Sequence, residues 1–367
     1  MQHVDVIAYF ADDPTRTSQL IQWLPVLELL DAQQPVGLVL RERTSLPIAC
    51  VEDFAELTDF YAASAARVVL YCNNSMLNFN SLLDARRLHV HINHGESDKQ
   101  SMASNNAKAY DRVFVAGEAA VRRYAAELLE LDTRKLVRIG RPQLDLRPPA
   151  VLEPSERRTV LYAPTWEGDA DYNDYTSVDT IGPDVVRAVL AIPDVRLVYK
   201  PHPKVVTSRT PAIAAGHREI LDLLAAAGHE HRAVTQGDIL AVIPDCDAMI
   251  TDVSSVGLDW LYLRTDKPIF ITDRHHDAER LRQDVPVSRC ADVLADVEVA
   301  ALARLVAARL VHDEHHLARV AMRHHYFDDV QVGESTTRFI QAVAALSAHR
   351  DRLLGAHTAG HGEQIIA

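Results

Sequence analysis

The sequence predicts an α/β protein made of two Rossmann-type, doubly wound parallel-sheet domains that face each other across a cleft. Short apolar runs alternate with segments long enough for a helix, which is typical of repeated βαβ units. The chain has 367 residues and is 48% hydrophobic, so it is long enough to bury two cores. Between two series of such runs, residues 147–158 (RPPAVLEPSERR) concentrate proline and charge and are expected to form a linker.

The apolar runs place the strands. In the first domain, expected over residues 1–147, we predict strands at 4–10, 36–40, 67–71, 88–92, 113–116 and 136–139. In the second domain, expected over 148–334, we predict strands at 160–163, 195–199, 248–251 and 268–271.

Helix signals complete the plan of the chain. The helix after the first strand is expected to be capped by Asp12 or Asp13 and to kink at Pro25. A last helix over 335–350 is expected to cross back to the first domain. Residues 351–367 are rich in glycine, histidine and small residues, so we expect them to be disordered.

Charge and cysteine content exclude several classes of protein. The net charge of −13 argues against nucleic-acid binding, for which a basic surface is the usual requirement. The four cysteines include no CxxC pair, so neither a zinc knuckle nor a disulfide framework is indicated. No signal pattern precedes the first strand, and no run of about 18 apolar residues occurs. We therefore expect a cytoplasmic protein without a membrane span.

The stretch AMITDVSSVGLD, residues 248–259, is the most informative one in the chain. An apolar strand runs into Ser254 and Ser255, which open a helix, and Asp259 follows one turn later. A helix start leaves backbone N–H groups without partners and carries partial positive charge, so serine hydroxyls beside it suit a phosphate oxygen. The alternative is that either serine only caps its own helix.

Two further predicted strands end in polar loops. The strand at 195–199 precedes Lys200, His202 and Lys204, and prolines on both sides of His202 stiffen that loop. The strand at 160–163 precedes Thr165 and Trp166. Because open α/β sheets bind ligands at the carboxyl ends of their strands, these loops suggest an anion site. The alternative for His202 is an exposed loop histidine.

Several motifs together resemble the CDP-glycerol glycerophosphotransferases of teichoic-acid synthesis. YAPTW (162–166), KPHP (200–203) and ITDVSSVGLD (250–259) occur in the order and spacing of that family. Gly140, Pro142 and Asp145 match its GxPxxD turn. His94 and Gly95 match its HG pair, with Lys99 at its lysine position. The carboxyl-terminal marks are Asp329, Gly333, Ser335 and Arg338.

This resemblance implies a GT-B arrangement and a reaction. An alditol phosphate would pass from a CDP-activated donor such as CDP-glycerol to a hydroxyl of a lipid-linked or saccharide acceptor, with release of CMP. His94 would act as general base, because an imidazole titrates near neutral pH, and Gly95 would allow close approach. His202, Lys200 and Lys204 would stabilise charge on the donor phosphates.

The remaining site residues have smaller implied roles. Ser254 and Ser255 would bind the donor phosphates, and Asp259 would bind a donor hydroxyl, because a carboxylate repels phosphate. Weaker candidates for substrate contact are Lys99, Thr165, Trp166 and Arg338. Trp166 would stack on the cytosine or anchor its loop. Glu96, Ser97 and Asp98 depart from the family pattern after the HG pair, so the acceptor side of the site is expected to differ.

Other chemistries have less support. No GxGxxG, GxxxxGK[ST] or GxSxG motif occurs. His312, His315 and His316 have helical metal-ligand spacing, but their charged neighbours favour a solvated helix face, so we predict neither a metal site nor a cofactor. The alternatives left open are a nucleotide-sugar glycosyltransferase or epimerase and an inactive donor-binding partner subunit. Divalent-ion assistance, oligomeric state and peripheral contact with the inner face of the membrane also stay open.

Overall fold

A computed structural model describes residues 4–12, 16–41, 50–99, 102–168 and 170–364. The chain forms two compact units. Unit 1 contains residues 1–96, 103–146 and 326–367, and unit 2 contains 97–102 and 147–325. The chain passes from unit 1 to unit 2 between Leu146 and Arg147, and it returns to unit 1 at Tyr326, ahead of the helix start that we expected at residue 335.

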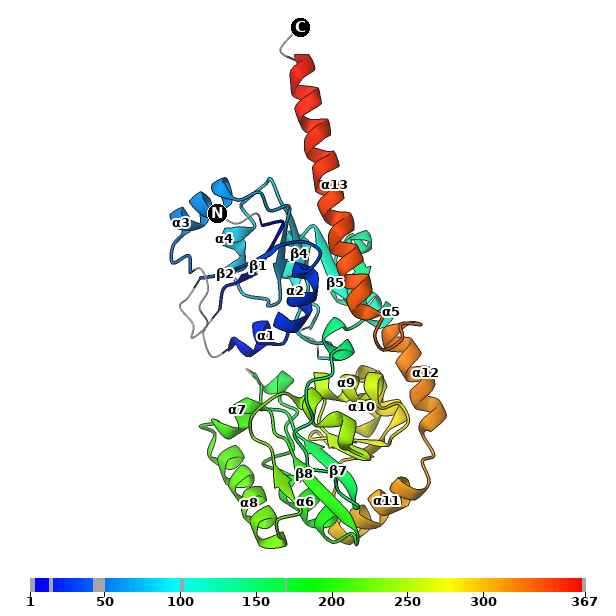
Figure 1. Cartoon of the computed structure of the whole chain (residues 1–367). Coiled ribbons are helices and arrows are strands. Elements are labelled where there is room, and N and C mark those ends of the chain that lie inside the picture. Colours follow the sequence, from blue (N-terminus) through cyan, green and yellow to red (C-terminus); the bar gives the residue numbers. More distant parts are fainter. Residues whose placement is uncertain (1–3, 13–15, 42–49, 100–101, 169, 365–367) are drawn as a thin grey trace. The chain divides into compact units, whose positions relative to one another are not determined.

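Unit 1 is built on a parallel six-stranded sheet in the order β2-β1-β3-β4-β5-β6 (Figure 1). Its first strand pairs on both sides, with Val6 opposite Val36 of β2 and Val68 of β3. The strands are β1 Val6–Phe10, β2 Val36–Leu40, β3 Val68–Tyr71, β4 Leu88–His91, β5 Arg112–Val115 and β6 Leu136–Arg138. The helices are α1 Ser18–Ile21, α2 Leu24–Asp31, α3 Phe54–Ala63, α4 Asn78–Ser81, α5 Glu118–Glu127 and α13 Ser335–Gln364.

Unit 2 is built on a second parallel six-stranded sheet, in the order β12-β11-β10-β7-β8-β9. The strands are β7 Arg158–Ala163, β8 Val195–Tyr199, β9 Arg232–Ala233, β10 Ala248–Thr251, β11 Ile269–Thr272 and β12 Asp292–Leu294. The helices are α6 Gly182–Leu190, α7 Pro203–Val206, α8 Pro211–Ala227, α9 Ser255–Leu263, α10 Ala278–Asp284, α11 Val299–Val311 and α12 His316–Phe327, whose last residues belong to unit 1.

The prediction of an α/β fold with two parallel sheets is confirmed, and every predicted strand is present with small differences at its ends. Two strands were missed. β9 has two exposed residues, and β12 has three residues of which only Leu294 is buried. Both lie at the edges of the sheet and are too short to produce an apolar run in the sequence.

The side chains of β1 point alternately into two cores, which shows why helices cover both faces of the unit 1 sheet. Val6 and Phe10 belong to one core, which includes side chains of α2 and α13. Ile7 and Tyr9 belong to another core, which includes side chains of α3 and α5. Because successive strand residues point to opposite faces, both faces of the sheet are covered by helices and an uninterrupted apolar strand is required.

Helix α13 docks against unit 1 through a fixed set of contacts. Phe339 packs between Trp23 and Phe114, with ring centroids 5.2 and 6.0 Å away. The Asp145 carboxylate accepts from the N–H of Gly333 (2.7 Å) and from the N–H of Thr336 (2.6 Å). The GxPxxD turn and the carboxyl-terminal marks therefore contact each other and fasten the start of this helix.

Gly140 shows how tight this contact is. Its φ of 77° lies in the left-handed region, and a Cβ built there would lie 2.2 Å from the Ser335 hydroxyl oxygen. That hydroxyl oxygen accepts from the N–H of Arg141 at 3.0 Å. Only glycine fits this position without displacing the helix start.

Two expectations about helices need correction. The helix after β1 is interrupted, and Pro25 lies in the first turn of α2, where its missing N–H costs nothing. The N-cap residue of α1 is Thr17, so the prediction of Asp12 as the cap is wrong, and the alternative cap Asp13 lies outside the described residues. Helix α13 continues to Gln364 and extends past the sheet (Figure 1), so the disorder expected from residue 351 is not observed up to that residue. Residues that extend an existing helix do not pay the free-energy cost of nucleation. This advantage is larger than the helix-destabilising effect of the scattered glycines.

We predict that Asp145→Ala destabilises unit 1 by about 1–3 kcal/mol, because two N–H groups at the start of α13 lose their acceptor. Urea unfolding followed by circular dichroism measures the loss. Asp59→Ala, at an exposed position of α3, is the matched control and should change stability by less than about 0.5 kcal/mol. Equal effects of the two substitutions would contradict the role of Asp145.

Candidate functional site

In unit 2 the predicted donor loops follow three neighbouring strands, β10, β7 and β8. Hydrogen bonds join these loops directly. The N–H of His202 donates to the carbonyl oxygen of Pro164 at 3.0 Å, and the N–H of Thr165 donates to an Asp252 carboxylate oxygen at 2.7 Å. The residues that follow these strands thus form one connected polar surface at the carboxyl edge of the sheet.

The serine turn lies between β10 and α9. Ser254 occupies the N-cap position with extended backbone, yet its side chain makes no capping hydrogen bond. Among the described residues its Oγ has no hydrogen-bond partner and is covered from solvent, although Ser254 and Ser255 are both partly exposed. Asp259, in the second turn of α9, is 5% exposed.

The KPHP loop arranges an imidazole and an ammonium around Trp166. The N–H of Lys204 donates to His202 Nδ1 at 3.2 Å, so the neutral ring carries its proton on Nε2. The rings of His202 and Trp166 stack with centroids 6.1 Å apart. Lys204 Nζ lies 3.4 Å from the centroid of the Trp166 ring, as in a cation–π contact.

Lys200 is the first residue after β8 and is 5% exposed. Burial lowers the pKa of Lys200, and the negative charge of Asp238 acts in the opposite direction. A buried ammonium of this kind gains from a bound anion more than an exposed one does, because less water screens the interaction.

Asp252 was not predicted as a site residue, although it lies within the serine motif. Its side chain is 1% exposed and accepts from the N–H of Thr165, from the N–H of Ser177 and from the Thr272 hydroxyl, at 2.7, 3.2 and 2.6 Å. Burial raises the pKa of Asp252 to about 6, although these hydrogen bonds lower it. Asp252 therefore fastens the loop after β7 and the last residue of β11 to the end of β10. An acid directly after a buried strand was the available signal.

Glu167 was also missed. One carboxylate oxygen accepts from the hydroxyls of Ser208 (2.6 Å) and Thr210 (3.1 Å), so the loop after β7 is tied to the segment between α7 and α8. Gly168 follows with a φ of 76°, and a Cβ there would lie 2.6 Å from the carbonyl oxygen of Asn173. These contacts hold the neighbouring Trp166 in a defined loop.

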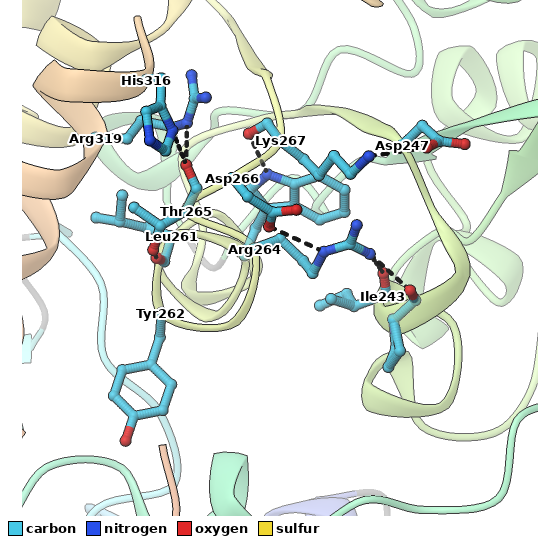
Figure 2. A network of polar contacts seen from close by, with 12 residues as sticks. Ile243, Asp247, Leu261, Tyr262, Arg264, Thr265, Asp266, Lys267, His316 and Arg319 are labelled. Atoms are coloured by element: carbon cyan, nitrogen blue, oxygen red, sulfur yellow. Dashed lines mark hydrogen bonds and ion pairs between the residues drawn. The ribbon is translucent and has the colours of Figure 1, made fainter. Parts of the chain in front are cut away.

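Helix α9 is also fastened at its carboxyl end, as Figure 2 shows. Arg264 Nη1 donates to the carbonyl oxygens of Ile243 and Pro244, at 3.2 and 2.6 Å. The carbonyl oxygen of Thr265 accepts from Arg319 Nε at 3.1 Å. Because a helix is stiff along its axis, these contacts also fix its amino-terminal turn, which carries the two serines.

In unit 1, His94 lies in the loop after β4. Its Nδ1 is 3.2 Å from the carbonyl oxygen of Cys72, which accepts the ring proton, and its Nε2 is 3.5 Å from the side-chain nitrogen of Gln19. Asn93 has a φ of 53°, and its carbonyl oxygen accepts from the Trp23 indole at 2.5 Å. Burial lowers the pKa of His94 to about 4, while the hydrogen bond to Cys72 raises it and the charge of Arg141 lowers it further. The ring is therefore neutral at pH 7, with a lone pair on Nε2.

Four other residues that the sequence suggested for substrate contact lie in surroundings that differ from one another. Gly95 follows His94 and is partly buried, and the next residue, Glu96, forms an ion pair of 2.5 Å with Arg123. Glu96, one of the residues that depart from the family pattern, therefore connects the HG loop to Arg123 of α5. Lys99 belongs to unit 2, where its Nζ lies 5.5 Å from the Tyr175 ring. Arg338, on α13 in unit 1, pairs with Glu334 at 3.5 Å. Thr165 is buried and anchored as described above.

The described residues contain no group of three or more histidine, cysteine or acidic side chains placed to hold a metal ion. The ring of His316 donates from Nδ1 to the carbonyl oxygen of Thr265, 3.2 Å away, and Nε2 of His315 lies 3.5 Å from the Asp292 carboxylate. Among the residues that the structure describes, no helix is long and apolar enough to cross a membrane.

Two parallel six-stranded sheets with flanking helices and polar loops at the carboxyl edges define an α/β protein of the GT-B type. Solved structures with the same fold support this class. The wall teichoic acid polymerase TagF has a TM-score of 0.61 at 14% identity, over 94% of this chain and 89% of that chain. MnaA of S. aureus with UDP has a TM-score of 0.58 at 13% identity, over 92% and 95%. A glycosyltransferase of Rickettsia africae has a TM-score of 0.55 at 13% identity, over 94% and 99%.

The sequence itself identifies the family. Residues 85–345 match the model of CDP-glycerol:poly(glycerophosphate) glycerophosphotransferases, and the chain belongs to this family. The resemblance drawn from the motifs is thereby confirmed, and the protein is a transferase. No curated protein matches the chain in sequence.

Asp252 generates a prediction about pH. Its folded-state pKa of about 6 lies above the unfolded value of 3.8, so the folded protein binds this proton more tightly. The stability that Asp252 contributes is therefore fully present below about pH 4 and is lost as the pH rises through about 6. The unfolding free energy of the wild type minus that of Asp252→Asn should fall by about 2 kcal/mol between pH 4 and pH 7.

Asp247→Asn is the matched control for urea unfolding at pH 4, 5, 6 and 7. Burial raises the pKa of Asp247, but the N–H of Thr159 and the Lys267 ammonium outweigh it, so the net shift is downward. Its contribution is present above the unfolded pKa and is lost on acidification, so the difference between wild type and this variant should rise with pH. A pH-independent difference for Asp252→Asn would contradict the assignment.

Proposed function

We propose that this chain transfers glycerol phosphate, or a related alditol phosphate, from a CDP-activated donor to a hydroxyl of a lipid-linked or saccharide acceptor and releases CMP. The product would be a teichoic-acid or capsule-type polymer. Family membership supports the reaction class. The observation that carries the proposal is the opposite hydrogen bonding of two histidines. His94 donates from Nδ1 and keeps a lone pair on Nε2, whereas His202 accepts at Nδ1 and keeps a proton on Nε2.

These two patterns suit the two ends of a phosphoryl transfer. His94 Nε2 would take the proton of the acceptor hydroxyl. The oxygen of that hydroxyl would attack the phosphorus that carries the glycerol. The bond between that phosphorus and the bridging oxygen would break, and CMP would leave with the bonding electrons. His202 Nε2–H, with Lys200 and Lys204, would stabilise the charge that develops on the leaving phosphate.

The remaining groups would bind the donor. Ser254, Ser255 and the first amides of α9 would hold the diphosphate, because that helix end presents N–H donors and partial positive charge. Asp259 would accept from a ribose or glyceryl hydroxyl. The free-site pKa of His94, about 4, makes it a weak base, and the negative charge of the bound donor would raise this pKa toward the working range.

A lipid-linked acceptor would place the enzyme on the cytoplasmic side of the membrane, at its inner face.

Binding of CDP compounds can be compared directly with binding of UDP compounds. The comparison is informative because MnaA, a protein of this fold, has been solved with UDP. Thermal-shift measurements with CDP, CDP-glycerol and UDP-sugars distinguish the proposal from a nucleotide-sugar glycosyltransferase or epimerase. Stabilisation by UDP-sugars alone would favour that second class.

We predict that His94→Asn lowers kcat for CMP release from CDP-glycerol by about 10³-fold, because the general base is removed, while donor affinity changes little. The measurement is CMP formation in the presence of membrane acceptors, with donor binding followed by calorimetry. His229→Asn, at an almost fully exposed position, is the matched control and should retain activity. Unchanged turnover in His94→Asn would favour an inactive donor-binding subunit in a larger complex.

We predict that Ser254→Ala weakens CDP-glycerol binding about tenfold while stability stays equal or rises. The Oγ of Ser254 lacks a partner among the described residues, so its removal costs the folded protein no hydrogen bond. If the serine were only a structural cap, stability would fall by about 1 kcal/mol instead. Ser288→Ala is the matched control, because Ser288 donates to the carbonyl oxygen of Val285 at 2.7 Å and its loss should affect stability alone.

A further inference from the structure

Trp166 contacts two of the groups that the proposed function assigns to the donor phosphates. The Lys204 ammonium lies 3.4 Å from the centroid of its ring, and the His202 ring stacks on it at 6.1 Å and 29°. Trp166 itself packs at the margin of the unit 2 core and is partly buried. Its loop is fixed by hydrogen bonds of Thr165 and Glu167.

The indole ring can act on both neighbours through ordinary forces. A lysine side chain has many rotamers, so its ammonium needs a contact that selects one position near the anion site. The negative face of an indole provides such a contact and remains weaker than an ion pair with phosphate, so the ammonium can transfer to a bound anion. His202 already has its ring orientation set at Nδ1 by the N–H of Lys204, and the stacked indole restricts the ring plane further.

We propose that Trp166 is a positioning residue, which presents the Lys204 ammonium and the His202 imidazole together to a diphosphate and does not serve as a stacking platform for the nucleobase. This rests on the proposed function, in which these two groups bind the donor phosphates. The ligand class that Trp166 serves is therefore the diphosphate, with or without an attached nucleoside.

Inorganic pyrophosphate separates the two roles, because it has no base to stack on. Trp166→Leu keeps an apolar side chain at the core margin and removes the ring, and it should weaken pyrophosphate and CDP binding by a similar factor of about ten. Trp166→Phe retains an aromatic face and should stay within about threefold of the wild type. Weakened CDP binding with unchanged pyrophosphate binding would overturn the proposal, and so would a wild-type protein that fails to bind pyrophosphate.

A double-mutant cycle tests whether Trp166 acts through Lys204. In a Lys204→Met background, Trp166→Leu should weaken pyrophosphate binding by less than about threefold, because the ammonium is gone and only the plane of the His202 ring remains for Trp166 to restrict. A further tenfold loss in that background would show that the two side chains act independently and would overturn the proposal.

Fluorescence gives a readout that does not require Trp166 to be replaced. The chain has three tryptophans, and Trp23 and Trp260 are 1% and 0% exposed, so Trp166 is the partly exposed one. Saturation with pyrophosphate should change the emission of the wild type as the ammonium leaves the ring, and this change should be absent in Lys204→Met. Emission that is unchanged at calorimetrically confirmed saturation would overturn the proposal.

These experiments distinguish a failure here from a failure of the proposed function. If pyrophosphate binding depends on Trp166 but the protein turns over UDP-sugars and not CDP-glycerol, the proposed reaction fails and the positioning role stands. If CDP-glycerol is turned over while Trp166→Leu binds pyrophosphate and CDP as the wild type does, the positioning role fails and the reaction stands.

Discussion

The Asp252 carboxylate is the contact on which the loops at the carboxyl edge of the unit 2 sheet depend. It joins the end of β10 to the loop after β7 and to Thr272 at the end of β11. A buried carboxylate is costly, and here two N–H groups and a hydroxyl offset that cost. Since the sheet is rigid, the loops that carry Trp166 and the two serines are held as a single body, which is the pre-organisation that binding a charged diphosphate requires.

The two histidines illustrate how backbone contacts can assign opposite chemistry to the same side chain. At His94 a carbonyl oxygen fixes the proton on Nδ1, and at His202 a backbone N–H fixes a lone pair there. The contact at His94 lies in no local motif, because the carbonyl belongs to Cys72, which is 22 positions away in the chain. The contact at His202 is local, because Lys204 lies two residues further along the chain. The HG and HP pairs therefore identify the residues, while the fold determines whether each one accepts or donates a proton.

What the sequence could predict followed from periodicity and local chemistry. Buried strands form apolar runs in the sequence, so the two sheets could be predicted. β9 and β12 are too short and too exposed to form such runs. Asp252 escaped notice because its partners Thr165 and Ser177 lie 87 and 75 positions away, and no local pattern encodes contacts at that distance. The helical tail was missed because composition near residue 355 says little about a helix that has already begun at Ser335.

The family marks divide into two kinds, those that hold the fold together and those to which the proposed function assigns chemistry. Gly140 and Asp145 contact Gly333 and Ser335 directly, so these marks, far apart in the chain, describe how α13 docks on unit 1. A protein could keep them and catalyse a different reaction, since their contacts hold the start of a helix in place. The proposed phosphoryl transfer would instead depend on His94 and on the loops at the carboxyl edge of unit 2, where hydroxyl, ammonium and imidazole groups follow the ends of buried strands.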